Sequence, residues 1–345
     1  MHQPIKKVVI AGGGTAGWMA AAALGKVLGK TLDITLIESD EIGTVGVGEA
    51  TIPTILTLHE VLKIKEQDFL SAVQGTFKLG ISFENWRDVG EDYIHSFGFT
   101  GKDHWAAGFQ HFWLKGQQRG MVKEYGEYCA EWLAAKQNRF AVLPNLKLNY
   151  AYHFDSSLYA KFLRGIAEEN GVVRREGMIA DVRQNPFNGH ISELRLSDGE
   201  VIEGDFFVDC TGFRGLLIEQ TLSAGYDDWT HWLPSDRAVA VQTESVGPPI
   251  PYTRAIAHEA GWQWRRSLLG TASSQSQDPH FTLEDGSWRR VVGYQRLGTE
   301  IVHEDYATDA GVSIRFGDGE FGLIPTEGTV FQVMYRLGDG RRSNV

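Results

Sequence analysis

The sequence predicts an α/β fold built on a parallel sheet, and its N-terminal region carries the observations that predict it. Residues 6–11 (KKVVIA) form a β-branched run that ends at a glycine cluster. Residues 15–28 are rich in helix formers, and residues 33–38 (DITLIE) return to β-branched alternation and end on an acid. A strand, a helix and a second strand at this spacing predict a βαβ unit, whose two strands are parallel.

Length and composition narrow the class of protein. A chain of 345 residues favours one large domain or two domains that share an interface. The apolar fraction of 42%, the charged fraction of 22% and the 40 glycines fit a folded α/β protein with many tight turns. The net charge of -11 argues against nucleic acid and anionic lipid as partners, so we expect small molecules or proteins.

Cysteine use and hydropathy predict the compartment. Cys129 and Cys210 form no CxxC pair, and no signal peptide precedes the first strand, which together predict a reducing cytoplasm. No apolar run approaches the ~20 residues that span a bilayer. We therefore expect a soluble, cytoplasmic protein that does not contact membranes.

Later segments continue the α/β pattern. The glycine-rich residues 43–50 predict an extended loop, and the apolar spacing over residues 52–62 predicts a helix that begins at Pro53. A further set of elements comprises a helix at 158–170, a strand in GVVRREGMIADV at 171–182, a polar turn at 185–189, a hairpin arm at 191–199 and a buried strand in DFFVD at 205–209.

The character of the chain changes after Ser267. Residues 273–277 (SSQSQ) are polar and of low complexity, and short strands separated by glycines are expected from there to residue 345. We therefore predict two domains, an α/β domain at 1–265 and a divergent β-rich tail at 266–345.

Aromatic residues are concentrated between residues 83 and 113. Aromatic side chains are commonly buried, so core packing is one interpretation of this segment and an aromatic-lined pocket is the other. The residues are Phe83, Trp86, Phe97, Phe99, Trp105, Phe109, Phe112 and Trp113.

Three glycines follow the first strand at the spacing of a dinucleotide-binding turn. Gly12 permits a tight turn, Gly14 lets a pyrophosphate approach the backbone, and Gly17 lets the helix pack on the sheet. The helix N-terminus offers free N–H groups to phosphates, and Glu38 can bind ribose hydroxyls. The alternative is a glycine-rich turn with no ligand, but the strand and helix around the glycines favour binding.

The acid at the end of the second strand favours a free ribose 2′-hydroxyl, which leaves FAD or NAD. The later strand at residues 205–215 (DFFVDCTGFRG) ends in Asp209 and continues to Gly212, and it resembles the second flavin-contacting strand of two-domain FAD enzymes. By the same resemblance, the backbone at Ile179 meets the adenine. FAD bound to a Rossmann-type fold of the glutathione-reductase-like kind is therefore the prediction.

Four stretches of the sequence carry a resemblance to a known family. They are GGGTAGWMAA at 12–21, IGTVGVGEATIP at 42–53, FKLGISFENW at 77–86 and FFVDCTGFRGLLI at 206–218. Together, over residues 5–264, they resemble the flavin-dependent tryptophan halogenases. General FAD monooxygenases share only the first and the last of the four.

The resemblance implies a halogenation chemistry. In the family, FADH₂ supplied by a separate flavin reductase reacts with O₂ and halide, and hypohalous acid reaches a lysine beside an aromatic substrate. Lys78 matches that lysine. An ammonium can polarise hypohalous acid, and an amine can become a haloamine, next to an electron-rich ring such as indole. An arbitrary lysine is usually solvated, but the surrounding motif favours the catalytic interpretation.

The resemblance also implies binding residues. For the substrate they are His95, Phe97 and Gly98, although a histidine in an aromatic stretch is as often a core residue. By resemblance, Glu49 lies against the flavin and the internal tunnel through which hypohalous acid travels to the lysine. The alternative is a plain loop carboxylate. The cofactor-binding residues are Gly12, Gly14, Thr15, Ala16, Gly17, Glu38, Val47, Gly48, Glu49, Ala50, Ile179, Asp209 and Gly212. No metal is expected.

The resemblance breaks at the family's Trp-x-Trp-x-Ile-Pro run. Arg266 and Ser267 stand where isoleucine and proline are expected after Trp264. The family's glutamate partner of the lysine and its Thr/Ser-Gly halide turn have no counterpart after that point, so we expect impaired activity. Residues 311–345, with IRFGDG, instead resemble segments of phage baseplate assembly proteins.

Two alternative functions stay open. One is an FAD-dependent monooxygenase or oxidoreductase that uses no halide. The other is a non-catalytic fusion in which the N-terminal fold is joined to a virion-type structural module. The sequence permits a homodimer without requiring one.

Overall fold

The computed structural model describes residues 4–42, 48–141, 147–233, 235, 238–239, 248–259, 261–266 and 268, and the backbone of four short strands between residues 282 and 315. The chain divides into two compact units. The first comprises residues 1–236, 247–269 and 337–345, and the second comprises residues 237–246 and 270–336.

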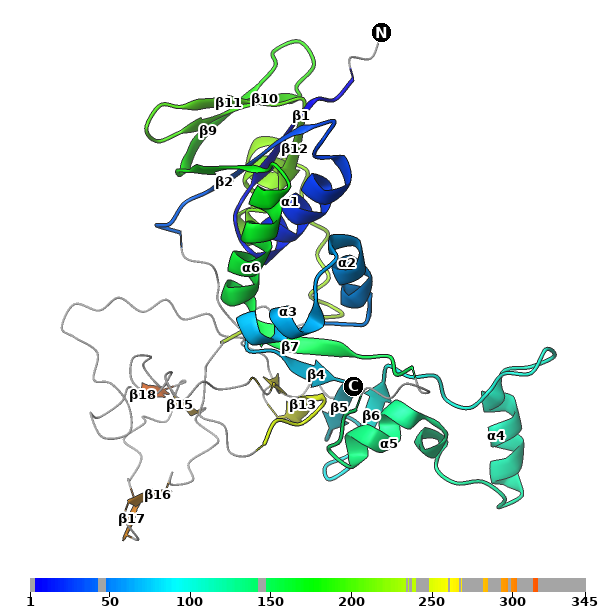
Figure 1. Cartoon of the computed structure of the whole chain (residues 1–345). Helices are drawn as coiled ribbons and strands as arrows, with labels where there is room; N and C mark the ends of the chain where they lie inside the picture. The colour runs from blue at the N-terminus through cyan, green and yellow to red at the C-terminus, as the bar shows by residue number, and fades with distance from the viewer. Residues whose placement is uncertain are drawn as a thin grey trace. The chain divides into compact units, whose positions relative to one another are not determined.

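A four-stranded parallel sheet, named the central sheet below, belongs to the first unit and lies toward the N-terminus in Figure 1. Its order is β12 (Phe206–Asp209), β1 (Lys7–Ala11), β2 (Asp33–Glu38) and β8 (Val173–Glu176). Ala11 pairs with Asp209 on one side and with Ile37 on the other, and Glu38 pairs with Glu176. Because the strands are parallel, their carboxyl ends lie at the same end of the sheet, and the glycine turn begins there.

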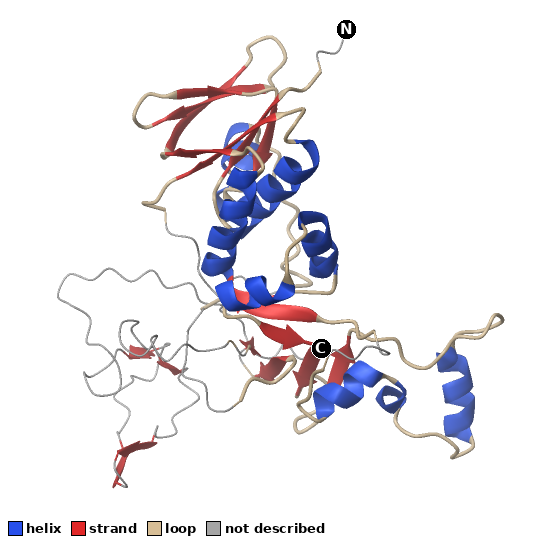
Figure 2. Cartoon of the chain, in the orientation of Figure 1, coloured by secondary structure: helices blue, strands red, loops and turns tan. Residues whose placement is uncertain are grey.

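The two faces of this sheet are covered by different elements (Figure 2). Strand alternation sends Val8 and Ile10 into a core with two helices, and Val9 and Ala11 into a core with a second sheet. The helices are α1 (Thr15–Leu28) and α6 (Ser156–Glu169), and the second sheet is antiparallel, with β9 (Ile179–Gln184), β10 (Ile191–Leu196) and β11 (Val201–Glu203). The predicted βαβ unit and fold class are confirmed.

Two further sheets hold the segments that the sequence assigned to catalysis. The elements are α2 (Thr54–Leu62), α3 (Glu66–Ala72), the sheet β3 (Gly48–Ala50), β7 (Ala151–Asp155) and β4 (Thr76–Lys78), and the sheet β14 (Gly261–Arg265), β13 (Thr253–His258), β5 (Gly80–Glu84) and β6 (Asp92–Ser96). The predicted loop at 43–50 ends in a strand, because Gly48–Ala50 pairs with β7. The helix predicted at Pro53 is confirmed with Pro53 as its N-cap residue.

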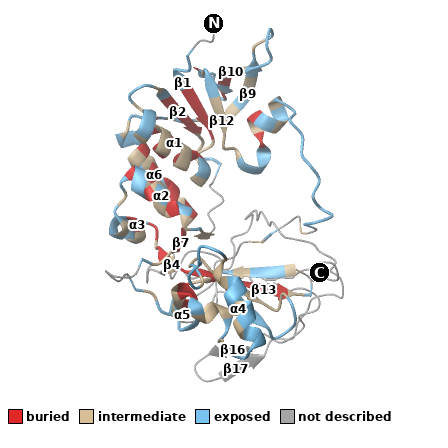
Figure 3. Ribbon diagram, turned by 90° about the vertical axis from the view of Figure 1, so that its right-hand side faces the viewer, coloured by how far each residue is buried: buried red, intermediate tan, exposed pale blue. Residues whose placement is uncertain are grey.

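The aromatic segment packs as a core only in part: Phe97 packs against the helix-side core of the central sheet, whereas other side chains of the segment are exposed. Helix α4 (Phe109–Gln118) has no buried residue, and Figure 3 shows none along it. Phe99 is 85% exposed and Trp105 is 92% exposed, so core packing is wrong for these side chains. The turn η1 (Tyr125–Tyr128) and α5 (Ala130–Lys136) follow, and α5 contributes Trp132 to a separate small core.

The strand predicted as buried near residue 205 is only partly so. Phe206 is 51% exposed because β12 lies at an edge of the central sheet. The turn η2 (Gly212–Arg214) and the π-helical turn η3 (Leu216–Thr221) follow it.

In the second unit, the structure describes two strand pairs. Strand β15 (Thr282–Glu284) pairs with β18 (Ser313–Arg315), and β16 (Gly293–Arg296) pairs with β17 (Thr299–Val302), both antiparallel. Most of residues 311–345 lie outside the described residues, and the predicted domain boundary and β-rich tail stay predictions.

Candidate active site

The glycine turn after β1 is closely packed at two of its three glycines. Gly12 has φ +107° and donates its N–H to the Ile37 carbonyl at 2.9 Å. A Cβ on Gly12 would lie 2.3 Å from the Cys210 carbonyl oxygen, and a Cβ on Gly17 would lie 1.9 Å from the Gly12 carbonyl oxygen. Both positions therefore require glycine for folding.

Gly14 differs, because a Cβ there would meet nothing within 4 Å. It is the N-cap residue of α1, and the first bond inside the helix runs from the Trp18 N–H to the Gly14 carbonyl at 3.1 Å. The amides before Trp18 therefore have no partner within the helix. Thr15 donates its hydroxyl to the Ser156 carbonyl at 3.3 Å, and Ala16 is exposed. Open space, amides and a positive helix end fit a pyrophosphate.

Glu38 lies at the end of β2, against the glycine turn. A Cβ on Gly13 would lie 1.7 Å from Glu38 Oε2, so the carboxylate occupies the place of that missing side chain. The Trp18 indole N–H donates to Oε2 at 3.1 Å, and the Arg174 guanidinium donates to Oε1 at 2.5 Å. A carboxylate has about four lone-pair sites, so acceptor capacity remains for ribose hydroxyls.

Asp209 shapes the loop at the end of β12. Its carboxylate accepts from the N–H and hydroxyl of Thr211 and from the N–H groups of Leu217 and Ile218, at 2.6–2.9 Å. Burial opposes ionisation, but these hydrogen bonds outweigh it and lower the pKa of Asp209. Gly212 has φ +65° and open space at its Cβ position. Asp209 thus holds the backbone of this loop, and its direct contact with the cofactor stays a prediction.

Ile179 is tied to the same edge of the sheet through its chain neighbours. The Gly177 N–H donates to the Glu38 carbonyl at 2.8 Å, and Ile179 begins β9 two residues later. Its side chain packs against the second core of the central sheet. These features fit the phosphate and adenosine parts of FAD. They are the open space at Gly14, the free N-terminus of α1, the remaining acceptor sites of Glu38 and the neighbouring backbone at Ile179.

Lys78 is a buried cation at the end of β4. It is 1% exposed, and its ammonium donates to the Thr51 carbonyl at 2.9 Å. Its Nζ lies 5.1 Å from the Phe97 ring centroid and 5.9 Å from that of Trp264. Burial, and then the charge of Arg266, lower the pKa of Lys78 from 10.5 to about 8. Near neutral pH both protonation states of this amine are accessible.

We use the name lysine chamber for Lys78 and for the side chains that interact with it directly or through Arg266. These are Glu49, Lys78, Phe97, His153, Trp264 and Arg266. Burial raises the pKa of Glu49, against the opposing charge of Arg266. Burial, and then the charges of Lys78 and Arg266, lower the pKa of His153 to about 3. Its ring nitrogens lie 3.3 Å from the Thr76 hydroxyl and 2.8 Å from the Thr253 hydroxyl. His153 is therefore a neutral link between strands.

The structure brings some of the predicted residues together and not others. Phe97 and the Thr51 carbonyl meet Lys78, and Glu49 interacts with Arg266, whereas His95 is exposed on β6. Gly98 serves packing, because a Cβ there would lie 1.8 Å from Glu131 Oε2. Val47 lies outside the described residues.

Sequence reasoning missed His153 and Arg174 as members of these sites. Arg174 sits on a strand that the sequence predicts, but its contact with Glu38 spans 136 residues. Trp264 and Arg266 were recognised only as part of an altered motif. The signal that could have found His153 is a polar residue within an otherwise apolar strand, AYHFD, at a position that points inward.

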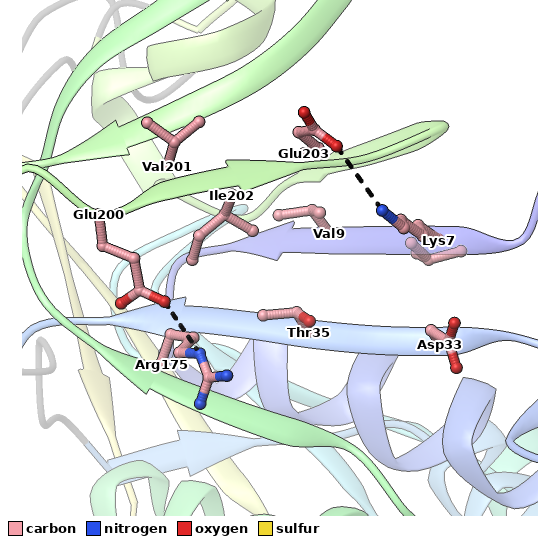
Figure 4. Close-up of a pocket in the computed structure, with 10 residues that line it drawn as sticks. Lys7, Val9, Asp33, Thr35, Arg175, Glu200, Val201, Ile202 and Glu203 are labelled. Carbon is pink, nitrogen blue, oxygen red and sulfur yellow. Dashed lines mark ion pairs between the residues drawn. The ribbon is translucent and has the colours of Figure 1, made fainter.

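A cavity of about 370 Å³ lies elsewhere on the central sheet (Figure 4). It is lined at the amino ends of β1 and β2 by Lys7 and Asp33, and by the β11 segment, where Glu203 lies 3.7 Å from Lys7. The glycine turn follows the opposite, carboxyl end of β1. This open cavity is therefore distinct from the candidate cofactor site.

The part of the chain that the structure describes offers neither a membrane-spanning helix nor a metal-binding cluster. Within it, no helix has the length and apolar character needed to cross a membrane. Within the same residues, no cluster of three or more His, Cys, Asp or Glu side chains could hold a metal ion.

The fold and the glycine turn define a protein with a Rossmann-type dinucleotide-binding fold, and comparisons with known proteins identify its family. The sequence model of the tryptophan halogenases matches residues 7–276, and the chain belongs to that family. Tryptophan 7-halogenase RebH from Lentzea aerocolonigenes is 37% identical over 342 residues, which cover 92% of this chain and 63% of RebH.

Solved structures agree with this assignment. Xcc4156, a flavin-dependent halogenase from Xanthomonas campestris, is 61% identical with a TM-score of 0.75. The match covers 77% of this chain and 54% of the Xcc4156 chain. BrvH, a flavin-dependent halogenase from Brevundimonas sp. BAL3, is 41% identical with a TM-score of 0.71, over 77% of this chain and 55% of BrvH. The chain thus spans between 54% and 63% of the length of these three relatives.

Proposed function

We propose that this protein is a flavin-dependent halogenase that acts on tryptophan, indole or another electron-rich aromatic. The observation that carries the proposal is Lys78, a buried amine with its Nζ 5.1 Å from the Phe97 ring centroid and hydrogen-bonded to the Thr51 carbonyl. A cation is costly to bury without a functional or structural reason. Family membership supports the same conclusion.

The proposed cofactor is FAD, reduced by a separate flavin reductase, with halide as co-substrate. When bound, reduced flavin supplies hypohalous acid from O₂ and halide. The turn at Gly14 and the α1 N-terminus bind the pyrophosphate, and Glu38 binds the ribose. Gly12 and Gly17 make this turn possible by packing. The Glu49 segment reaches from the flavin side to Lys78 through the Thr51 carbonyl.

Lys78 can act on hypohalous acid in either protonation state. The ammonium can donate a hydrogen bond to the oxygen, so that oxygen leaves as water while the ring carbon takes the halogen and loses its proton. The neutral amine can instead take the halogen, which gives a haloamine and water, and then pass it to the ring. A pKa of about 8 makes both forms available at physiological pH.

Phe97 is the proposed contact for the aromatic substrate, because its ring lies beside the Lys78 amine. His95 and Gly98 remain substrate residues only by resemblance. The net charge of -11 supports small molecules or proteins as partners rather than nucleic acid or membrane. The free cysteines Cys129 and Cys210 support a cytoplasmic setting.

The test is product formation by the full chain with FAD, a flavin reductase, NADH, O₂ and bromide, with indole or tryptophan as substrate. Mass spectrometry at high enzyme concentration should detect a monobrominated product that requires bromide and FAD together. Omission of bromide provides the matched control. Absence of FAD binding by the purified chain, with no brominated product, would refute the proposal.

One observation favours a second candidate, an FAD monooxygenase. Arg266 and Ser267 replace the Ile-Pro of the family run that is taken to block substrates near the flavin. Arg266 is coupled electrostatically to Glu49 and Lys78, so the altered residue faces the proposed reaction path. An oxygenated product that forms equally well without halide would select this candidate.

A further inference from the structure

We propose that Arg174 and Trp18 are positioning residues that hold Glu38 in place for the ribose of the adenosine half of the cofactor. This inference rests on the proposed function only in that the ligand is FAD. It adds two side chains that act through Glu38 rather than on the ligand: Trp18, which directly follows the glycine turn, and Arg174, which is 136 residues from Glu38 in the sequence.

The Glu38 carboxylate is held on both oxygens. Arg174 donates through Nε to Oε1 at 2.5 Å, and the Trp18 indole donates to Oε2 at 3.1 Å. Arg164 approaches Oε1 at 3.7 Å, and its guanidinium also lies 6.0 Å from the Trp18 ring centroid. These contacts fix the direction of the remaining lone pairs, which is what hydrogen bonds to two neighbouring hydroxyls require.

Arg174 is itself fixed. Its side chain is 15% exposed, and its second nitrogen donates to Asp40 at 2.5 Å, so one guanidinium joins the acid at the end of β2 to the segment that follows. Glu38 is 16% exposed, which leaves the pair sheltered from solvent screening. Planar guanidinium groups hold a carboxylate in one plane better than an ammonium does.

The neighbouring Arg175 is a matched control. Side chains alternate along a strand, so Arg174 and Arg175 of β8 point to opposite faces. Arg175 instead pairs with Glu200 at 3.3 Å and lines the cavity that also borders Lys7 and Asp33, as Figure 4 shows. A general effect of losing one arginine from β8 should therefore appear when either Arg174 or Arg175 is replaced. An effect that acts through Glu38 should appear only when Arg174 is replaced.

The experiment compares the binding of ADP and 2′-deoxy-ADP to the full chain by titration calorimetry. Wild type should bind 2′-deoxy-ADP about tenfold more weakly, the expected loss of a hydrogen bond to a charged group. Arg174→Gln and Trp18→Phe should bind ADP more weakly and discriminate between the two ligands by less than about twofold. Arg175→Gln should behave like wild type.

A double-mutant cycle separates positioning from folding. In a Glu38→Gln background, Arg174→Gln should have little further effect on ADP affinity, because its effect runs through Glu38. If Arg174→Gln and Trp18→Phe both keep full discrimination, the inference is wrong and the proposed function stands. If Arg174→Gln does not fold, Trp18→Phe alone decides the result. If wild type binds neither FAD nor ADP, the cofactor assignment itself fails.

Discussion

The cofactor end of the sheet and the lysine chamber are built in different ways. Most residues of the cofactor end lie within one βαβ unit. Gly12 and Gly17 are required there because the turn leaves no space for a Cβ atom, and because Gly12 has a positive φ. The lysine chamber instead gathers Glu49 and Lys78 from two strands that flank β7 in one sheet, and Trp264 from a second sheet. The first kind of site can be recognised from a short stretch of sequence. The second kind forms only when segments far apart in the sequence pack together.

Lys78→Met should have the largest effect on the lysine chamber and almost none on the cofactor end. Met fills a similar volume and removes the amine, so halogenation should fall by about 100-fold or more, as for loss of one key electrostatic group. FAD affinity and the unfolding temperature should stay at or above wild type, because the desolvated charge is gone. Product mass spectrometry, flavin titration and thermal unfolding measure these three. Unchanged halogenation would contradict the role of Lys78.

Gly12→Ala should show that the cofactor end is limited by folding. A positive φ and a Cβ 2.3 Å from the Cys210 carbonyl oxygen should cost roughly 2 kcal/mol of unfolding free energy. Gly14→Ala places its Cβ in open space and should cost far less stability. Urea denaturation of both variants gives the comparison. Equal stabilities would mean that the turn is not packed as the structure shows.

The pH dependence of halogenation reports the lysine chamber directly. Because the pKa of Lys78 is lowered to about 8, the rate should inflect between pH 7 and pH 9. A rise through this range assigns the neutral amine, and a fall assigns the ammonium. A rate that stays flat from pH 7 to pH 9 would contradict a titrating lysine.

The same pKa predicts a change of stability with pH. The folded value of about 8 lies below the ordinary value of 10.5, so the unfolded chain binds more protons between these limits. Stability should therefore increase as pH rises from about 8 to 10.5, by an amount on the order of 3 kcal/mol. Denaturation curves of wild type minus Lys78→Met isolate this increase, and a difference that does not vary with pH would contradict it.

Arg266→Met should have the smallest effect. Removing the Arg266 charge relieves one cause of the lowered pKa of Lys78, so the inflection in the rate should move to higher pH. Burial remains the larger cause and limits the movement. Arg265→Met is the matched control, because Arg265 is exposed and bonds to Gln263. A shift of the same size in both variants would exclude a specific role for Arg266.

The fold was largely predictable from the sequence, and the sites only in part. The strands at 6–11 and 33–38, the helix at 158–170 and the hairpin arm at 191–199 were found from local pattern. Exposed Trp105 was misjudged, because aromatic composition does not show which surface a side chain covers. His153 and Arg174 were missed, because their partners Thr253 and Glu38 are brought near only by sheet pairing.

The most direct test of the cofactor site is a titration of FAD into wild type and Gly14→Val, followed by flavin fluorescence. Valine at this position meets no protein atom at its Cβ, so the variant should fold normally while its side chain fills the space proposed for the pyrophosphate. We expect saturable binding by wild type and a loss of at least about tenfold in the variant. Equal binding by both proteins, or no binding by a folded wild type, would contradict the proposed flavin site.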